Sequence, residues 1–238
     1  MIKILAIGNS FSQNATELLQ LFNNELFVRN LYIGGCSLAM HCDNIKGNVK
    51  AYDYQENGAK LYPFQISIKD ALLLEKWDYI TVQQVSGYSG KIESYYPYIE
   101  ELIEYVKKYS DAEIVLHQTW AYDNYSTHPH FKLYDNDRKV MYGQIAETTR
   151  KVAEKEKLRT IPVGEAIEKL RAVDLFVPEN GGLSLTCDGF HLSENYGRFS
   201  AAAVWLKFFT GELPEFLNRE NLSTPFKKIK EILIQMPD

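Results

Sequence analysis

Residues 3–12 read KILAIGNSFS, in which a short apolar run ends at Gly8 and a polar pair that contains Ser10 follows. An apolar run of this length that stops at glycine is typical of a buried strand entering a tight turn. Asn14 comes next and has a glutamate three residues later, which is the form of a capping box. We therefore expect a strand, a turn that carries Ser10, and a helix over residues 14–24.

The same alternation of apolar strand and amphipathic helix continues along the chain. Further strands are predicted at 26–33, 78–82, 113–116 and 160–163, and further helices at 67–76, 95–106, 138–157, 165–173 and 193–210. Five short apolar strands that alternate with helices indicate βαβ units, and hence a parallel sheet with helices on both faces. Because crossovers are right-handed, an open, doubly wound five-stranded sheet is the simplest topology. Residues 36–63 show no sustained period and are expected to form a long, partly ordered loop.

The composition argues against several classes of protein. The 238 residues are expected to form one domain, 1–238, with a C-terminal helical tail at about 212–238. An excess of 31 acidic over 26 basic residues argues against a nucleic-acid partner, and no apolar stretch is long enough to span a membrane. Three cysteines cannot all pair within one chain, and so sparse a count fits a reducing compartment. We therefore expect a cytoplasmic protein, or a periplasmic or secreted one if a leader precedes Met1.

Polar or glycine-rich segments follow four of the five predicted strands. These segments are 8–12 (GNSFS), 34–37 (GGCS), 83–86 (QQVS) and 117–120 (HQTW). In an open α/β sheet, ligands bind at the carboxyl ends of the strands, so we expect the functional site there. Far downstream, the segment Asp188-Gly-Phe-His191 stands just before the last long predicted helix.

Ser10 and His191 are candidates for a nucleophile and its base. A serine on a tight turn between strand and helix raises its hydroxyl above the sheet edge, and a nearby histidine is the usual base for such a serine. Asp188, three residues before His191, could accept from one ring nitrogen and leave the other free to take the serine proton. Taken singly, each residue is explained as well by an ordinary loop or surface role, and Ser12 is a competing nucleophile.

Taken together, these features resemble a known superfamily of hydrolases. The Gly-Asn-Ser turn at Ser10, Gly35 after the second strand, the polar end of the third strand and Asp188-x-x-His191 are similar to the four ordered blocks of SGNH (GDSL-type) hydrolases. The runs ILAIGNSFS, LYIGGCSL, WDYITVQQVS, HQTWAY and DGFHLS are similar to those of the bacterial DUF4886 group over nearly the whole chain. The resemblance implies a flavodoxin-like sheet and a serine esterase that requires neither a metal nor an organic cofactor.

The resemblance also implies a role for each matching residue. Ser10 would be the nucleophile, His191 the general acid and base, and Asp188 its orienting partner. The backbone N–H groups of Ser10 and Gly35 would be two donors of the oxyanion hole.

Two positions depart from the pattern of the superfamily. The third oxyanion donor of typical members is an asparagine in a Gly-x-Asn-Asp block, which this chain lacks. We expect the side-chain amide of Gln84 to replace it, with Gln83 as the alternative, because both stand at the end of the third strand. A missing oxyanion donor costs on the order of 3 kcal/mol of transition-state stabilisation. Asn9 stands where GDS-type members carry aspartate, and we expect little effect from this change.

The segment after the fourth strand supplies further candidates. His117, Gln118 and Trp120 are expected to line the substrate pocket, although His117 is explained equally well as a buried, hydrogen-bonded residue. A metal-dependent hydrolase would use His128 and His130. Its further ligands would come from His41, Cys42 or Asp43. Two histidines around a proline are more often part of a loop, so we expect no metal. Cys187 adjoins Asp188 and is expected to be a small packed residue rather than a nucleophile.

The sequence therefore predicts a serine esterase with a Ser10–His191–Asp188 triad. Its substrate would be a short-chain acyl ester, for example an acetyl ester, of a small molecule or a carbohydrate. The alternative from another class is a non-catalytic protein that binds a glycan or a small ligand at the same strand ends.

Overall fold

The computed structural model describes residues 1–236 and contains one seven-stranded sheet in the order β4-β3-β2-β1-β5-β6-β7. The strands are β1 Ile2–Gly8, β2 Leu26–Tyr32, β3 Asp53–Glu56, β4 Ala59–Lys60, β5 Tyr79–Val82, β6 Glu113–His117 and β7 Arg159–Ile161. The five strands β2, β1, β5, β6 and β7 are parallel to one another. Their order, 2-1-3-4-5 in sequence, is that of flavodoxin-like sheets. The predicted α/β class and parallel sheet are confirmed.

Helices connect the strands. They are α1 Ser10–Thr16, α2 Leu19–Phe22, α3 Leu38–Lys46, α4 Ile68–Leu74, α5 Tyr98–Lys107, α6 Arg138–Glu156, α7 Val163–Arg171, α8 Phe199–Thr210 and α9 Thr224–Gln235. Short 3-10 helices lie at Ser86–Tyr88, Ile92–Ser94, Pro129–Tyr134, Asp174–Phe176, Pro178–Asn180 and Glu215–Asn218, and a π-helical segment, Glu194–Arg198, leads into α8. No helix within residues 1–236 is long and apolar enough to cross a membrane.

The prediction of five strands was wrong, because the segment 36–63 contains a two-stranded hairpin. β3 and β4 pair antiparallel to each other, and β3 pairs antiparallel to β2 at the edge of the sheet. Asn57 and Gly58 join the two strands with φ angles of +49° and +76°. An Asn-Gly pair in this conformation is the preferred two-residue hairpin turn.

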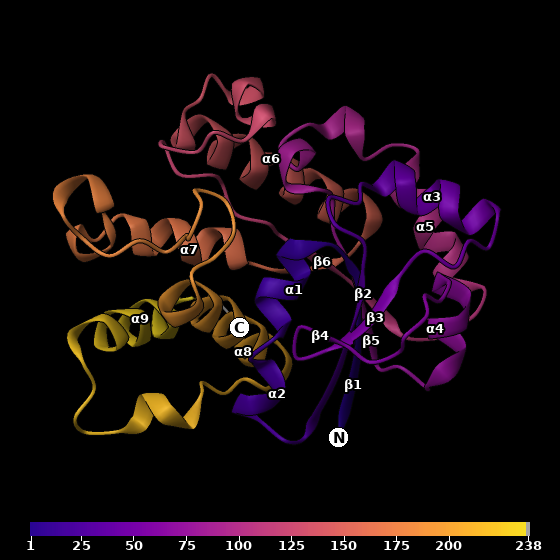
Figure 1. Cartoon of the computed structure of the whole chain (residues 1–238), viewed down its shortest axis with the longest axis horizontal. Coiled ribbons are helices and arrows are strands. Elements are labelled where there is room, and N and C mark those ends of the chain that lie inside the picture. Colours follow the sequence, from indigo (N-terminus) through magenta and orange to yellow (C-terminus); the bar gives the residue numbers. More distant parts are fainter. Residues whose placement is uncertain (237–238) are drawn as a thin grey trace.

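Apolar side chains of β1 alternate between the two faces of the sheet and enter two separate cores. Ile4 and Ala6 belong to one core, while Leu5 and Ile7 belong to the other. As Figure 1 shows, α3, α4 and α5 lie on one side of the sheet, and α1, α7 and α8 on the other. Strands buried on both faces read as continuous apolar runs, which is why the sequence predicts them well.

The first helix begins at Ser10 and not near Asn14. Asn9 is its N-cap, because the Asn9 side chain accepts a hydrogen bond from the backbone N–H of Phe11. The Asn14 side-chain oxygen instead accepts from the backbone N–H of Leu192, at 2.9 Å. Asn14 therefore joins α1 to the segment that follows His191. The predicted C-terminal tail, 212–238, contains α9, and its positions 237–238 lie outside the described residues.

Candidate active site

Ser10 stands at the first position of α1, directly after the turn that leaves β1. Its Oγ lies 2.9 Å from Nε2 of His191, across 181 positions of sequence. The turn is closely packed, since a Cβ on Gly8 would lie 2.5 Å from the Ser12 Oγ. Glycine at position 8 therefore lets the chain turn from the strand into the helix, with the Ser10 hydroxyl at the carboxyl edge of the sheet.

His191 is held by Asp188 in the orientation that a general base requires. The Asp188 Oδ2 lies 2.7 Å from His191 Nδ1, while its Oδ1 accepts from the backbone N–H groups of Phe190 and His191. Partial burial raises the pKa of the Asp188 carboxyl, but these hydrogen bonds outweigh burial and hold the pKa below its usual value. An ionised Asp188 favours the tautomer in which Nδ1 donates to Asp188 and Nε2 accepts from the Ser10 hydroxyl.

The loop that carries Asp188 and His191 is anchored to the segment after β6. Trp120 donates from its indole N–H to the Phe190 carbonyl at 2.8 Å, and the backbone N–H of Asp123 donates to the Gly189 carbonyl at 2.8 Å. Gly189 has a φ of +89°, and a Cβ there would lie 2.8 Å from the Ser126 Cα. The backbone conformation and the close contact both require glycine between Asp188 and His191.

A buried ion pair holds Asp123, whose backbone N–H makes the contact with the Gly189 carbonyl. Asp123 Oδ1 lies 2.9 Å from Arg171 Nε, and the two side chains are 5% and 1% exposed. The other oxygen of Asp123 accepts a hydrogen bond from the Thr186 hydroxyl, and Arg171 donates to the Ala121 carbonyl at 2.8 Å. Asp123 therefore joins the loop 120–123 to the loop 186–191, and Arg171 on α7 holds Asp123 in place.

Two backbone N–H groups, in the loops that follow β1 and β2, are candidate oxyanion donors. Within the described residues, the N–H groups of Ser10 and Gly35 donate to no protein acceptor. Gly35 is exposed and has a φ of +64°, a conformation that favours glycine. Asn9 connects the two loops, because its side-chain N–H donates to the Cys36 carbonyl at 3.0 Å.

The two glutamines after β5 have structural partners. Gln84 donates from Nε2 to both the carbonyl and the hydroxyl of Ser94, and its Oε1 accepts from the Leu38 N–H. The Gln84 amide nitrogen therefore faces Ser94, and its oxygen faces Leu38, so the amide is committed to joining these segments. Gln83 donates to Asn9 Oδ1 at 2.9 Å and lies 2.7 Å from His117 Nδ1, which leaves one amide N–H without an identified acceptor.

The three predicted pocket residues do not gather at Ser10. Trp120 is fully buried and stacks on Phe11, with ring centroids 4.1 Å apart. His117 is 2% exposed, and burial lowers its pKa to about 3, so the imidazole is neutral. Gln118 lines a different pocket, between α6, α7 and α8. Of the three, Trp120 acts on the site indirectly, by supporting the loop of His191.

The other candidates from the sequence have no catalytic geometry. Ser12 is 1% exposed, and its hydroxyl hydrogen-bonds to Asn30 and to the Asn9 backbone, so it cannot serve as a nucleophile. His41 is fully buried beside Cys36, whose pKa burial raises to about 12. Cys187 is exposed, so the prediction that it is a small packed residue was wrong; desolvation by neighbouring residues nevertheless raises the pKa of its thiol. No cluster of three or more metal-ligating side chains occurs among residues 1–236.

Sequence reasoning missed the residues that support the triad. Asn14, Asp123 and Arg171 each contact a residue that is more than 45 positions away in the sequence. The residues that they contact cannot be identified from spacing. A weak signal was present in Asp123, a carboxylate within the apolar and aromatic run after β6, since a buried carboxylate needs a cation.

Several solved structures are similar in fold to this chain. A DUF4886 family protein from Bacteroides uniformis is 36% identical, with a TM-score of 0.85 and coverage of 98% of this chain and 92% of that one. A candidate SGNH hydrolase from Slackia heliotrinireducens is 23% identical, with a TM-score of 0.59 and coverage of 87% and 98%. A single-residue variant of an acetyl xylan esterase from Geobacillus stearothermophilus is 15% identical, with a TM-score of 0.56 and coverage of 89% and 96%.

The two more distant structures show that the fold is shared with SGNH-type hydrolases. Comparison with curated proteins finds no match. The family model described as "Domain of unknown function (DUF4886)" matches residues 3–223, which is most of the chain. Together with the relative from Bacteroides uniformis, this match establishes that the chain belongs to the DUF4886 family.

Proposed function

We propose that the protein is a serine esterase in which Ser10, His191 and Asp188 form a catalytic triad. The observation that carries the proposal is the continuous chain of contacts from Ser10 Oγ to His191 Nε2, at 2.9 Å, and from His191 Nδ1 to Asp188, at 2.7 Å. Nucleophile, base and orienting carboxylate stand in the order that acyl transfer requires. A non-catalytic ligand-binding protein would have no need of a base aligned on a serine.

The reaction is a two-step acyl transfer. Ser10 attacks the ester carbonyl while His191 takes its proton, and the backbone N–H groups of Ser10 and Gly35 stabilise the oxyanion. His191 then protonates the leaving alcohol, and an acyl-enzyme remains. Water, activated by the same imidazole, attacks the acyl-enzyme and releases the acid and free Ser10.

The substrate that we propose is a short-chain acyl ester, such as an acetyl ester, of a carbohydrate. Partly buried aromatic rings flank the catalytic imidazole: Phe190 lies 4.2 Å from His191 and 4.9 Å from His128, between ring centroids. Flat rings beside polar atoms suit the stacking of a sugar ring. The shared fold with an acetyl xylan esterase supports the same choice of substrate.

The direct test compares p-nitrophenyl acetate hydrolysis by wild type, Ser10→Ala and Cys187→Ala. We expect Ser10→Ala to lower kcat/KM by roughly 10³-fold or more, and Cys187→Ala to leave it unchanged. A fluorophosphonate probe should label the wild type, and mass spectrometry should map the label to Ser10. Equal hydrolysis by Ser10→Ala, or labelling at another serine, would exclude the proposal. If no ester is hydrolysed and no serine is labelled, the binding protein is the better description.

A further inference from the structure

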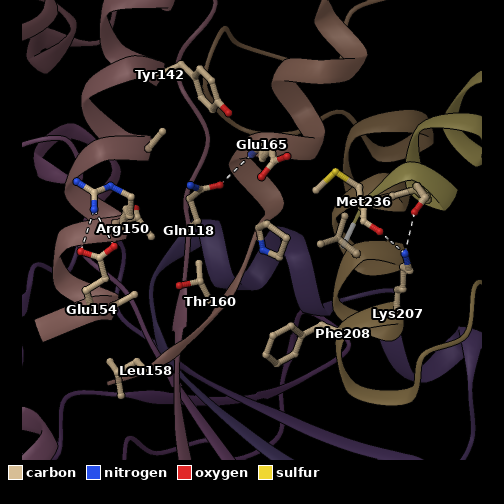
Figure 2. Close-up of a pocket in the computed structure, with 16 residues that line it drawn as sticks. Gln118, Tyr142, Arg150, Glu154, Leu158, Thr160, Glu165, Lys207, Phe208 and Met236 are labelled. Carbon is tan, nitrogen blue, oxygen red and sulfur yellow. Dashed lines mark hydrogen bonds and ion pairs between the residues drawn. The ribbon is translucent and has the colours of Figure 1, made fainter. Parts of the chain in front are cut away.

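A groove of about 500 Å³ runs along the outer edge of β7, away from the triad. Figure 2 shows its floor, formed by Leu158 and Thr160 of the β7 segment, between a wall from α6 and a wall from α8. Arg150 belongs to the α6 wall and Phe208 to the α8 wall. The volume is within the range of cavities that bind small ligands.

The floor of the groove presents an unpaired stretch of main chain. β7 is the last strand of the sheet, so no strand in residues 1–236 pairs with its outer edge. The Ile161 carbonyl accepts from the Gln118 N–H at 3.1 Å, and therefore points toward β6. Because successive residues of a strand direct their polar groups to opposite sides, the N–H and C=O of Thr160 point outward. Thr160 itself lines the groove, together with its neighbours at 158 and 162, so this part of β7 faces the groove.

A buried side-chain amide adds a further donor. Gln118 is 7% exposed, and its Oε1 accepts from the Glu165 N–H at 2.9 Å. Within the described chain, the Gln118 Nε2 has no hydrogen-bond acceptor. In Figure 2 this amide lies between the α6 wall and Glu165, in the middle of the groove. Gln118 Nε2 is not among the fully buried atoms that lack a partner, so it is open to the groove and can donate to a ligand in place of water.

The charged side chains that line the groove balance one another, with Arg150 and Lys207 as cations and Glu154 and Glu165 as carboxylates. Arg150 pairs with Glu154 at 2.7 Å, and Glu165 pairs with Lys169 at 2.7 Å. Lys207 donates to the Leu233 carbonyl at 3.2 Å. The remaining lining includes apolar side chains such as Leu158 and Phe208. A complementary ligand therefore carries apolar groups and no net charge.

We propose that this groove binds a neutral, amide-bearing ligand with apolar side chains, the chemistry of a short apolar peptide. The ligand lies as an added strand on β7, with one amide donating to the Thr160 carbonyl and one carbonyl accepting from the Thr160 N–H. β7 contains three residues, so the matching ligand is about three residues long.

The test uses N-acetyl-Leu-Leu-N-methylamide and its analogue methylated on every amide nitrogen, titrated into the ¹⁵N-labelled full chain. We expect a Kd on the order of 0.1–1 mM for the first peptide, with resonance shifts at Thr160 and Gln118. The analogue lacks donors and should bind about tenfold more weakly. Equal affinities, or the absence of saturable shifts at these residues, would overturn the proposal.

Two variants at one position separate the main chain from the side chain. Thr160→Val keeps the outward N–H and should bind the peptide as the wild type does. Thr160→Pro removes that N–H, a change that edge strands tolerate, and should weaken binding about tenfold. Both should hydrolyse p-nitrophenyl acetate at the wild-type rate. If Thr160→Pro does not fold, the methylated peptide still decides. Sedimentation that reveals a dimer abolished by Thr160→Pro would instead assign the groove to a second copy of the chain.

Discussion

The ion pair between Asp123 and Arg171 predicts a large loss of stability when one charge is removed. Asn is nearly the same shape as Asp, so Asp123→Asn removes the charge while leaving the packing in place. The variant keeps an acceptor for the Thr186 hydroxyl, and its backbone N–H can still donate to the Gly189 carbonyl. The change therefore removes the charge of Asp123 together with one of its two acceptor oxygens, because the amide nitrogen that replaces it can only donate.

The magnitude follows from burial. The side chains of Asp123 and Arg171 are 5% and 1% exposed, so the remaining guanidinium would be a buried charge without its nearest counterion, left only with the weaker attraction of Glu168. Breaking such a pair costs about 3–5 kcal/mol. For a chain of this length each kcal/mol lowers Tm by about 2–4 °C, which gives an expected decrease of about 6–20 °C.

The assay is thermal and urea unfolding followed by circular dichroism, with Glu113→Gln as the matched control. Glu113 and Arg159 form an ion pair at 3.4 Å, with side chains 43% and 50% exposed. An exposed pair contributes less than about 1 kcal/mol, so the control should differ little from the wild type. Both variants remove one carboxylate charge, and only its burial differs.

Equal midpoints for Asp123→Asn and Glu113→Gln would refute the reasoning. The double variant Asp123→Leu/Arg171→Met provides a second check, since apolar replacement of a buried pair is often neutral or stabilising. We expect the double variant to be more stable than Asp123→Asn. If the double variant is less stable than Asp123→Asn, the loss of stability in Asp123→Asn comes from packing around this site and not from the unpaired charge.

Three further predictions concern the site and its support. Asp188→Asn should lower kcat by about 10⁴-fold with little change in KM, because the new amide donates to His191 Nδ1 and leaves the proton on Nε2; a change below tenfold in ester hydrolysis would contradict this. His117 has a pKa of about 3 when folded and about 6.5 when unfolded, so its stabilisation is complete above pH 6.5 and is lost as the pH falls toward 3. Between pH 7 and pH 5, His117 should account for about 2 kcal/mol of the decrease in unfolding free energy. In His117→Asn the decrease, measured by urea titration at both pH values, should be smaller by that amount. Gly35→Ala should cost about 1–2 kcal/mol because φ is +64°, and Gly35→Asn should cost less; equal unfolding midpoints for the two would count against a left-handed constraint.

The parallel part of the sheet follows from the sequence because its strands are buried on both faces. β1 and β5 read as apolar runs that end in glycine or in polar residues, and such runs carry a strong signal. The hairpin of β3 and β4 has no such signal, since its strands are four and two residues long and mostly polar. Only Asn57-Gly58 marks it, and this dipeptide predicts a turn without predicting which strand the hairpin joins.

The residues of the candidate site also fall into some that the sequence predicts and some that it does not. Ser10, Asp188 and His191 stand in short local patterns at chain turns, so the sequence could name them and the structure brings them within hydrogen-bonding distance. Their support depends on contacts between distant segments, such as Asp123 with Arg171, that no local pattern encodes. Gln84 is an example: its position at the end of a strand suggested an oxyanion donor, but its amide nitrogen donates to Ser94.

Asn9 shows why the departure from aspartate matters more than the sequence suggested. Its oxygen accepts from the Phe11 N–H and the Gln83 amide, while its nitrogen donates to the Cys36 carbonyl. A carboxylate could accept the first two hydrogen bonds but could not donate the third, and it would face a carbonyl oxygen with negative charge. The loop of Gly35 is therefore held to the Ser10 turn by a bond that only an amide can make at this position. The glutamine at 83, which continues to His117, completes a neutral network in place of a charged one, so the asparagine and the buried, neutral histidine belong to a single arrangement.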